Sequence, residues 1–323
     1  ALGGPLVDPA RLQLPRTNAD SVIEVAEGVA LSRPLVFPDF VVLTRNDVAV
    51  DALAGASLLR GGPLLVSTHD AVSDSTMAAM AEVLPNGGRV YVLGGEAALS
   101  ADIDTQLASH GYEVVRLAGD SRVDTALAIA EEVRRVYPGS TTVALARSDG
   151  GNDPTAQWAD ALSGGAWTAS TGTPLLVTPG DQLHPGVADA LQRWGTQETI
   201  LFGGEAALSQ AVEAAVPGAR RIGGADRAAT AAMIAEDLWG DTEGFMVANG
   251  YYARGWPAGL AAAGWGADVN APLLYTGADA VPQATVDVLA AACPDTDSMQ
   301  IVGGASLVTG SAETQLLEAA TCG

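Results

Sequence analysis

The chain has 323 residues, of which 48% are hydrophobic and 17% charged, so it can bury folded cores and is not a disordered chain. Its formal net charge is −22, and all 16 basic residues are arginines. So negative a chain argues against binding to nucleic acid or to a membrane through a basic patch, and no apolar run is long enough for membrane insertion.

The first third of the chain alternates predicted helices with short apolar strands. Ser21 to Glu24 spell a capping box, which predicts a helix start at Ser21. Further along, Met77, Met80 and Leu84 share one face of a helix. The expected elements in chain order are a helix at 21–31, a strand at 41–45, a helix at 51–59, a strand at 63–68, a helix at 72–84, a strand at 89–93, a helix at 101–109 and a strand at 112–117. Because apolar strands that alternate with helices favour parallel pairing, helices should cover both faces of each sheet.

This pattern recurs twice more along the chain. Its clearest markers are a Gly-Gly pair after one predicted strand and a Pro-Leu-Leu segment that opens another. The Gly-Gly pairs begin at Gly94, Gly203 and Gly303, and the Pro-Leu-Leu segments begin at Pro63, Pro174 and Pro272. We therefore expect an α/β fold of three tandem Rossmann-like or flavodoxin-like modules with parallel sheets, divided as 1–117, 118–222 and 223–323.

The two ends of the chain depart from the repeat. The first two modules are expected to end with a strand, at 112–117 and 219–222, whereas the third ends after a helix at 312–320. The segment 10–14 precedes the first helix, where such a strand would stand. We expect this segment to add the missing strand to the third module and so to close the array.

The chain has two cysteines, Cys293 and Cys322, and both belong to the third module. A pair confined to one terminal module predicts a single disulfide, formed in an oxidising compartment. Such a cross-link stabilises by about 3–4 kcal/mol in the chain-entropy description. Two buried free thiols are the alternative.

Arg122 and Arg227 each follow a turn that contains glycine and precede a predicted helix. A guanidinium group there can hold a phosphate or a carboxylate with two hydrogen bonds, and the N–H groups of the helix start add to such a site. Both are candidate ligand-binding residues, together with Asp124. A second interpretation stays open, in which each arginine pairs with Asp124, Asp226 or an acid of another module and only fixes an interface.

Asp51 and Asp160 stand between the first strand of a module and the helix that follows it. Ligands of parallel sheets bind beside the carboxyl ends of the strands, so these carboxylates are candidates to accept hydrogen bonds from sugar hydroxyls. The alternative is that each aspartate caps its helix. Arg147 and Asn152, next to and within the long polar loop before Asp160, complete the candidate binding residues.

Aromatic side chains occur in or next to the same loops. Trp158 follows the loop of the second module, and Tyr251, Tyr252 and Trp256 lie in the corresponding part of the third. Two roles are open for them, which are stacking on sugar rings and packing of adjacent modules against one another.

In this order, the motifs resemble the cell wall-binding repeat 2 family of Gram-positive bacteria. The matching segments are 122–126, 160–163, 174–177 and 203–209, with equivalents in the other modules, and the resemblance covers about residues 15–323. It implies three repeats around a pseudo-threefold axis and non-covalent attachment of a surface protein to an anionic polymer of the cell wall. Two departures bear on whether the modules are equivalent: the first module lacks the Gly-x-Asp-Arg start, and Ala258 replaces the aspartate in the third.

From the resemblance we expect a secreted cell-surface protein that anchors, without catalysis, to an anionic polysaccharide or teichoic-acid-like polymer, as a monomer with internal pseudo-threefold symmetry. The exclusive use of arginine is typical of high-GC genomes and favours an actinobacterial source. No cofactor or metal is expected, because a chain without lysine has no Walker A loop and the three histidines, His69, His110 and His184, lack metal-ligand spacing. The alternatives are an extracellular structural or protein-interaction module and, third, a carbohydrate-active enzyme.

Overall fold

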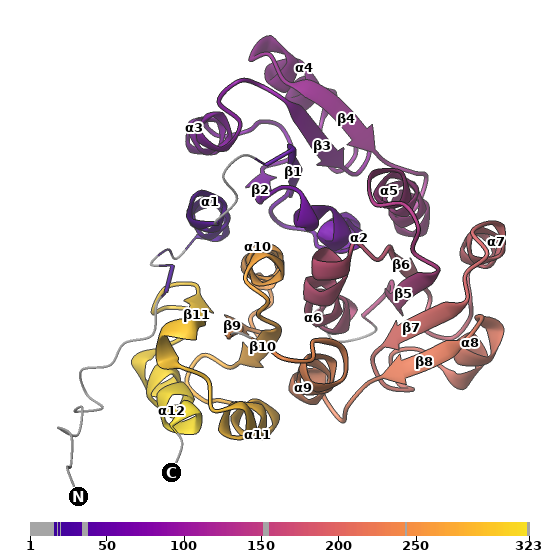
Figure 1. The fold of residues 1–323 in the computed structure, drawn as a ribbon. Coiled ribbons are helices and arrows are strands. Elements are labelled where there is room, and N and C mark those ends of the chain that lie inside the picture. The colour runs from indigo at the N-terminus through magenta and orange to yellow at the C-terminus, as the bar shows by residue number, and fades with distance from the viewer. Residues whose placement is uncertain are drawn as a thin grey trace, which may run out of the picture.

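The computed structural model describes residues 16–17, 19, 21–33, 38–150, 155–242 and 244–321. Within this part of the chain, helices cover three parallel sheets, whose strand orders are β2-β1-β3-β4, β6-β5-β7-β8 and β10-β9-β11. Figure 1 shows the three units around a common centre. The expected α/β fold of three tandem modules in a pseudo-threefold arrangement is confirmed. The division of the chain after residues 117 and 222 stays a proposal.

The first module contains α1 (Val22–Ser32), β1 (Phe40–Arg45), α2 (Val50–Ala54), the 3₁₀ helix η2 (Gly55–Arg60), β2 (Leu64–Ser67), α3 (Asp74–Val83), β3 (Arg89–Leu93), α4 (Ala101–Ser109) and β4 (Glu113–Leu117). The second contains α5 (Arg122–Val136), β5 (Thr142–Arg147), α6 (Ala156–Thr171), β6 (Leu175–Thr178), α7 (Pro185–Arg193), β7 (Glu198–Phe202), α8 (Gln210–Ala215) and β8 (Ala219–Ile222). The third contains α9 (Arg227–Leu238), β9 (Phe245–Asn249), α10 (Trp256–Asp268), β10 (Leu273–Thr276), α11 (Gln283–Ala292), the 3₁₀ helix η3 (Thr296–Ser298), β11 (Met299–Val302) and α12 (Gly310–Ala320).

The elements of the first module begin within two residues of the positions that the sequence predicts. Ser21 accepts a hydrogen bond from the backbone N–H of Glu24, and the side chain of Glu24 accepts one from the N–H of Ser21, so the expected capping box is present. One expected helix, 51–59, is divided into α2 and the 3₁₀ helix η2. The α-helix gives way to the 3₁₀ helix at Gly55. Glycine is a poor former of α-helix, which accounts for the change at this position.

Small residues let the modules meet closely at the centre, where α2 with η2, α6 and α10 lie against one another (Figure 1). A Cβ atom on Gly165 of α6 would lie 2.8 Å from the Cβ of Ala56 in η2. A Cβ atom on Gly259 of α10 would lie 2.4 Å from Cδ2 of Leu162 in α6. These distances leave no room for a larger residue, and one apolar core runs through all three modules.

The start of the chain completes the third module. Arg16 forms a parallel bridge with Ile301 of β11, and the carbonyl of Ala19 accepts a hydrogen bond from the N–H of Gly304. The expected strand segment 10–14 lies outside the described residues. The described residues that follow it, Arg16, Thr17 and Ala19, pair with the third module, which agrees with closure of the array, while the strand at 10–14 stays a prediction.

One ion pair recurs in all three modules, beside the last strand of the sheet or the segment that takes its place. It joins an arginine of the fourth strand, or of its equivalent, to an acid in the first turn and a half of the helix after the Gly-Gly loop. The pairs are Arg116–Asp104, Arg221–Glu213 and Arg16–Glu313, with N–O distances of 2.6, 2.8 and 2.6 Å. Arg16, which precedes α1, therefore makes in the third module the ion pair that an arginine of the last strand makes in each of the other two modules.

Two further expectations fall on residues outside the described part of the chain. Asn152 is one of them, so its candidate role in binding stays a proposal. Cys322 is the other, so the disulfide between Cys293 and Cys322 also stays a prediction.

Candidate binding sites at the module junctions

Each module meets the next through the helix that follows its last strand. We call the contact of α5 with α2 the first junction, that of α9 with α6 the second junction, and that of α1 with α10 the third junction. Since these helices start at the carboxyl ends of parallel strands, their first residues lie beside the Gly-Gly loop of the preceding module. This is the edge of a parallel sheet where ligands usually bind.

The first junction places a half-buried carboxyl between two guanidinium groups. Asp51 lies in α2, Arg45 ends β1 and Arg122 begins α5. Burial raises the pKa of Asp51, and the charges of Arg122 and Arg45 offset only part of this effect. Arg122 is exposed and donates from Nη1 to the carbonyl of Ser148 at 2.5 Å, while Arg45 pairs with Asp47 at 2.5 Å. The guanidinium groups therefore stand at the mouth of the junction.

The second junction repeats this arrangement. Asp160 of α6 lies near Arg147, the last residue of β5, and Arg227, the first residue of α9. Burial is the largest effect on Asp160 and raises its pKa, whereas a hydrogen bond from Thr230 and the two arginines act in the opposite direction. Arg227 donates from Nη1 to the carbonyl of Gly250 at 2.7 Å. The four side chains line a pocket of about 170 Å³.

Each of these carboxyls lies against the first glycine of a Gly-Gly pair. Gly94 has φ +102° and Gly203 has φ +107°, in the left-handed region that favours glycine. A Cβ atom on Gly94 would lie 2.8 Å from a carboxyl oxygen of Asp51, and one on Gly203 would lie 2.5 Å from a carboxyl oxygen of Asp160. The repeat needs glycine here both for the turn and for the space that the carboxyl occupies.

The third junction has the same arrangement of strand end and helices as the other two, but it lacks their two arginines and their aspartate. Three positions define each junction: the last residue of the central strand, the aspartate position and the first residue of the next helix. They are Arg45, Asp51 and Arg122 at the first junction, Arg147, Asp160 and Arg227 at the second, and Asn249, Ala258 and Val22 at the third. The missing arginine of the first module and the missing aspartate of the third thus belong to one and the same junction.

The structure excludes one of the two interpretations of the aspartates, and the other, a binding role, stays a proposal. The helices α2 and α6 both begin before their aspartate, so the interpretation of Asp51 and Asp160 as helix caps is wrong. Asp124 is the residue that belongs to a cap: its N–H donates to the hydroxyl of Ser121, and its carboxylate accepts from that hydroxyl at 2.7 Å. A binding role for Asp124 stays a proposal.

Two residues of the junctions are missing from the set that the sequence indicated. Arg45 ends β1 as Arg147 ends β5, so a comparison of the repeats position by position would have found it. Thr230 carried no such signal, because its role depends on the fold. Its hydroxyl donates to Asp160 and accepts from the N–H of Gly224 at 3.1 Å.

The aromatic residues near the second junction divide into two groups. The side chains of Trp158 and Trp256 are buried, with 1% and 2% exposure, and pack modules together. Tyr251 and Tyr252, in the loop after β9, are exposed at 45% and 44%. Packing is therefore the role of the tryptophans, and only the tyrosines are placed to contact a ligand.

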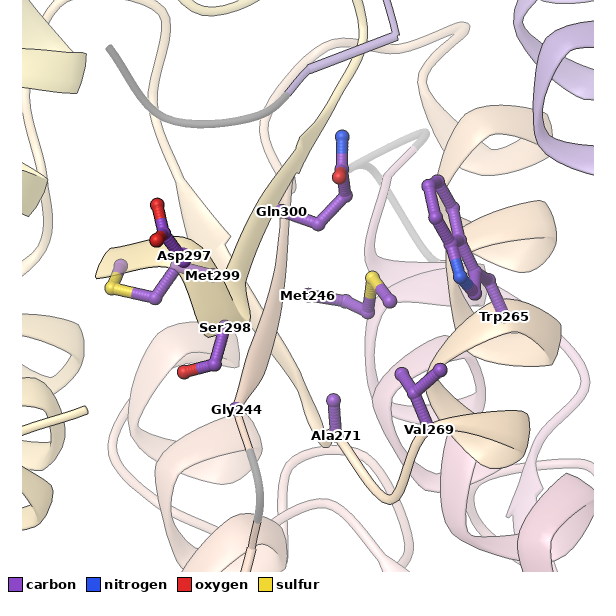
Figure 2. Close-up of a pocket in the computed structure, with 9 residues that line it drawn as sticks. All are labelled: Gly244, Met246, Trp265, Val269, Ala271, Asp297, Ser298, Met299 and Gln300. Carbon is purple, nitrogen blue, oxygen red and sulfur yellow. The ribbon is translucent and has the colours of Figure 1, made fainter. Parts of the chain in front are cut away.

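A different cavity, of about 240 Å³, lies at the opposite edge of the third sheet (Figure 2). It opens at the amino ends of β9 and β11 and is bounded by Trp265 and Val269 of α10. Its lining includes Met246 and one carboxylate, Asp297, but no arginine. Because it lies away from the Gly-Gly loops and has no cationic group, we do not count it among the candidate binding sites.

The two charged junctions can hold an anion through guanidinium groups and accept hydroxyl donors through a carboxyl. In the part of the chain that the structure describes, we find no group of three or more histidine, cysteine, aspartate and glutamate side chains that could hold a metal ion. None of the described helices has the length and apolar character needed to cross a membrane.

Comparison with known proteins was made for the whole chain. A model of the family named cell wall binding domain 2 (CWB2) matches residues 17–104, 116–213 and 221–313. The N-acetylmuramoyl-L-alanine amidase LytC of Bacillus subtilis is 28% identical over 228 residues, which are 70% of this chain and 43% of that protein. The amidase enhancer of the same bacterium is 24% identical over 287 residues, 87% of this chain and 37% of its own length. The chain thus spans less than half the length of these relatives.

Two solved structures share the fold. The Clostridium difficile protein Cwp6 matches with a TM-score of 0.84 and 20% identity, over 96% of this chain and 48% of its own. Cwp8 of the same organism matches with a TM-score of 0.82 and 24% identity, over 96% of this chain and 52% of its own.

Proposed function

The chain belongs to the cell wall binding domain 2 family, and we propose that it binds the wall by holding anionic groups of a wall glycopolymer at its first and second junctions. The observation that carries this proposal is the repeated set of two arginines around one carboxyl at each of these junctions. The ligand-binding residues would be Arg45, Asp51 and Arg122 at the first junction and Arg147, Asp160, Arg227 and, by its place in the sequence, Asn152 at the second.

Charge supports this assignment. The chain carries a net charge of −22, so it repels an anionic polymer except where positive groups are concentrated. Each charged junction brings two guanidinium groups near a carboxyl whose pKa is raised by burial, and one guanidinium of each pair, Arg45 or Arg147, also pairs with a neighbouring aspartate, Asp47 or Asp149. Two such sites in one packed body also raise the affinity for a polymer with many anionic groups, because the second contact forms at a high effective concentration.

We further propose that the chain acts outside the cell of a Gram-positive actinobacterium, as a monomeric anchor without catalytic activity. The three modules already form a pseudo-threefold body within one chain, so no second copy is needed to complete a junction. The two cysteines of the third module, if they form the predicted disulfide, fit an oxidising compartment. The amidase activity named for LytC is not assigned to this chain, which covers 43% of that protein.

The test is sedimentation of the purified chain with purified Gram-positive cell walls. We expect Arg122→Ala and Arg227→Ala each to weaken binding by about tenfold and the double variant to weaken it further, since each removes a charge-assisted contact. Arg220→Ala is the control, because Arg220 is exposed on β8 and outside both junctions.

The walls themselves provide the second control. Walls from which the anionic polymer has been extracted should bind the wild-type chain far less than intact walls do. Binding that is equal on extracted and intact walls, or equal for the wild type and the double arginine variant, would show that the junctions do not hold the polymer.

A further inference from the structure

The loop after β9 presents two tyrosines beside the second junction. The side-chain oxygen of Asn249 accepts hydrogen bonds from the N–H groups of Tyr251 and Tyr252, at 2.9 and 3.0 Å. Asn249 itself is buried and donates to the carbonyl of Leu307. The loop is therefore fixed from inside, and the exposed rings keep their place at the surface.

One of these rings lies against Arg227, a residue that lines the charged pocket. The guanidinium carbon of Arg227 is 5.0 Å from the ring centre of Tyr251, and Arg227 also donates to the carbonyl of Gly250. The same pocket is lined by Arg147 and Asp160. An aromatic face, two guanidinium groups and two carboxyls, those of Asp160 and Asp226, thus stand together at one place on the surface.

The size of the pocket limits what can enter it. Its volume of about 170 Å³ is well below the roughly 300–1,000 Å³ of sites that enclose a whole drug-sized ligand. The pocket has room for an anionic substituent, and the ring that carries the substituent must lie outside it. The ring of Tyr251, 45% exposed, is the surface on which that ring would rest.

The first junction lacks this aromatic surface. Arg122 donates there to the carbonyl of Ser148, as Arg227 does to that of Gly250, and Ser148 is followed by Asp149 and Gly150 in place of Tyr251 and Tyr252. The first junction can therefore contribute charge alone, which makes it an internal control for the second.

We infer that the second junction is a subsite for an anionic sugar, with the sugar ring stacked on Tyr251 and its carboxylate or phosphate held by Arg227 and Arg147. Tyrosine stacks on the C–H face of a sugar ring, and guanidinium groups hold carboxylates and phosphates with paired hydrogen bonds. Asp160 accepts a hydrogen bond from a sugar hydroxyl. This inference rests on the proposed function and names the chemical unit of the polymer that the second junction recognises.

The experiment is calorimetric titration of the full chain with four small probes. Glucuronate and glucose 1-phosphate carry both a ring and a charge, glucose carries only the ring, and inorganic phosphate carries only the charge. We expect at least one of the two anionic sugars to bind about tenfold more tightly than either glucose or phosphate, because only it uses both parts of the site. Which of the two binds better distinguishes a uronic acid from a sugar phosphate.

Substitutions of Tyr251 test whether the sugar ring stacks on this side chain. Tyr251→Ala should weaken binding of the anionic sugar by about tenfold and leave phosphate binding unchanged, whereas Tyr251→Phe should keep the wild-type affinity. Arg122→Ala, at the first junction, should leave the effect of Tyr251→Ala intact. Circular dichroism of each variant shows that the fold is retained.

Anionic sugars that bind no better than glucose or phosphate, or equally well to the wild type and to Tyr251→Ala, overturn this inference. The wall sedimentation separates it from the broader proposal. If the wild-type chain binds intact walls while the sugar titrations fail, only the subsite is wrong. If the wild-type chain does not bind walls, the proposed function fails whatever the titrations give.

Discussion

The carboxyl of Asp160 is buried and lies near arginines of two modules, Arg147 of the second and Arg227 of the third. A carboxyl removed from water prefers its neutral form, and the hydrogen bond from Thr230 with the charges of Arg147 and Arg227 compensates only in part. The glycine at position 203 leaves the space that this carboxyl occupies, because a Cβ atom there would lie 2.5 Å from a carboxyl oxygen. The junction thus keeps an acid that costs stability in its charged form, a feature more typical of functional sites than of structural ion pairs.

This burial predicts the sign of a pH effect. Because the pKa of Asp160 is raised in the folded state, the folded chain binds the proton more readily than the unfolded chain does. Its contribution to stability is therefore favourable at low pH and is lost as the pH rises through the folded-state pKa. Asp160→Asn lacks this contribution, so the free energy of unfolding of the variant minus that of the wild type should increase as the pH rises above about 4, the ordinary pKa of aspartate.

Urea unfolding of both proteins at a series of pH values measures this difference. Asp102→Asn, which changes an exposed aspartate in the first turn of α4, is the control for a general effect of charge. A difference between Asp160→Asn and wild type that stays constant with pH would mean that Asp160 has an ordinary pKa.

Among the elements, α1 and α10 show how a junction is held without the central charges. Arg33, which ends α1, forms two hydrogen bonds with Asp268 at the end of α10, from Nε at 2.6 Å and from Nη2 at 2.8 Å. Its remaining donors reach the carbonyls of Leu59 and Gly62 in the first module. Both charged side chains are buried, at 2% and 7% exposure, so removal of either would leave a buried charge without its partner.

The third junction is therefore closed by packing, and a carboxyl placed there has no cation to face it. Ala258 is 3% exposed, and Val22 stands at the helix start where the other junctions have Arg122 and Arg227. We expect Ala258→Asp to lower the free energy of unfolding by about 2–5 kcal/mol, because it buries an uncompensated charge. Adding Val22→Arg should restore at least about 1 kcal/mol of this loss.

A double-mutant cycle by urea unfolding tests the pairing. Val22→Arg alone should cost about 1 kcal/mol or less, because Val22 is only half-buried at the start of its helix. Single and double variants whose effects simply add would show that positions 22 and 258 do not face each other as Arg122 and Asp51 do.

For the whole molecule, closure joins residues that are nearly the full chain length apart. Thr17 donates to the carbonyl of Ile301 at 3.2 Å, and its hydroxyl accepts from the N–H of Gly303 at 2.8 Å. Arg16 adds the ion pair with Glu313 that the other two modules make internally. The first and third modules are thus linked through the start of the chain, as the other pairs are linked by continuous backbone.

A chain that begins at Ser21 tests this closure. Amide exchange at Gly303 and Gly304 should become at least about tenfold faster, because both amides lose acceptors before α1, and protection should also fall in β11 and α12. Arg116→Ala removes the equivalent ion pair of the first module, where the strand is covalently continuous on both sides, and should affect exchange less. Faster exchange confined to the first module would contradict closure.

The sequence by itself determined the repeat, the order of helices and strands, the parallel sheets and most of the charged candidates. It could do so because hydrophobic period, capping and turns are local properties, read within a few residues; the strand 89–93 and the helix 101–109 have the expected bounds for that reason. Local sequence also allowed Asp51 to be interpreted as a helix cap. That interpretation is wrong because α2 begins before its aspartate, which the local pattern does not show.

Only the tertiary structure decided which of these residues meet. Arg122 faces Asp51 and Arg227 faces Asp160 across module boundaries, and the departures at positions 22, 249 and 258 fall at one junction. Tertiary packing likewise buries Trp158 and Trp256 and leaves Tyr251 and Tyr252 exposed. The physical reason is that contacts between distant residues depend on how three modules pack around small residues at a shared centre, and no local pattern along the chain encodes that packing.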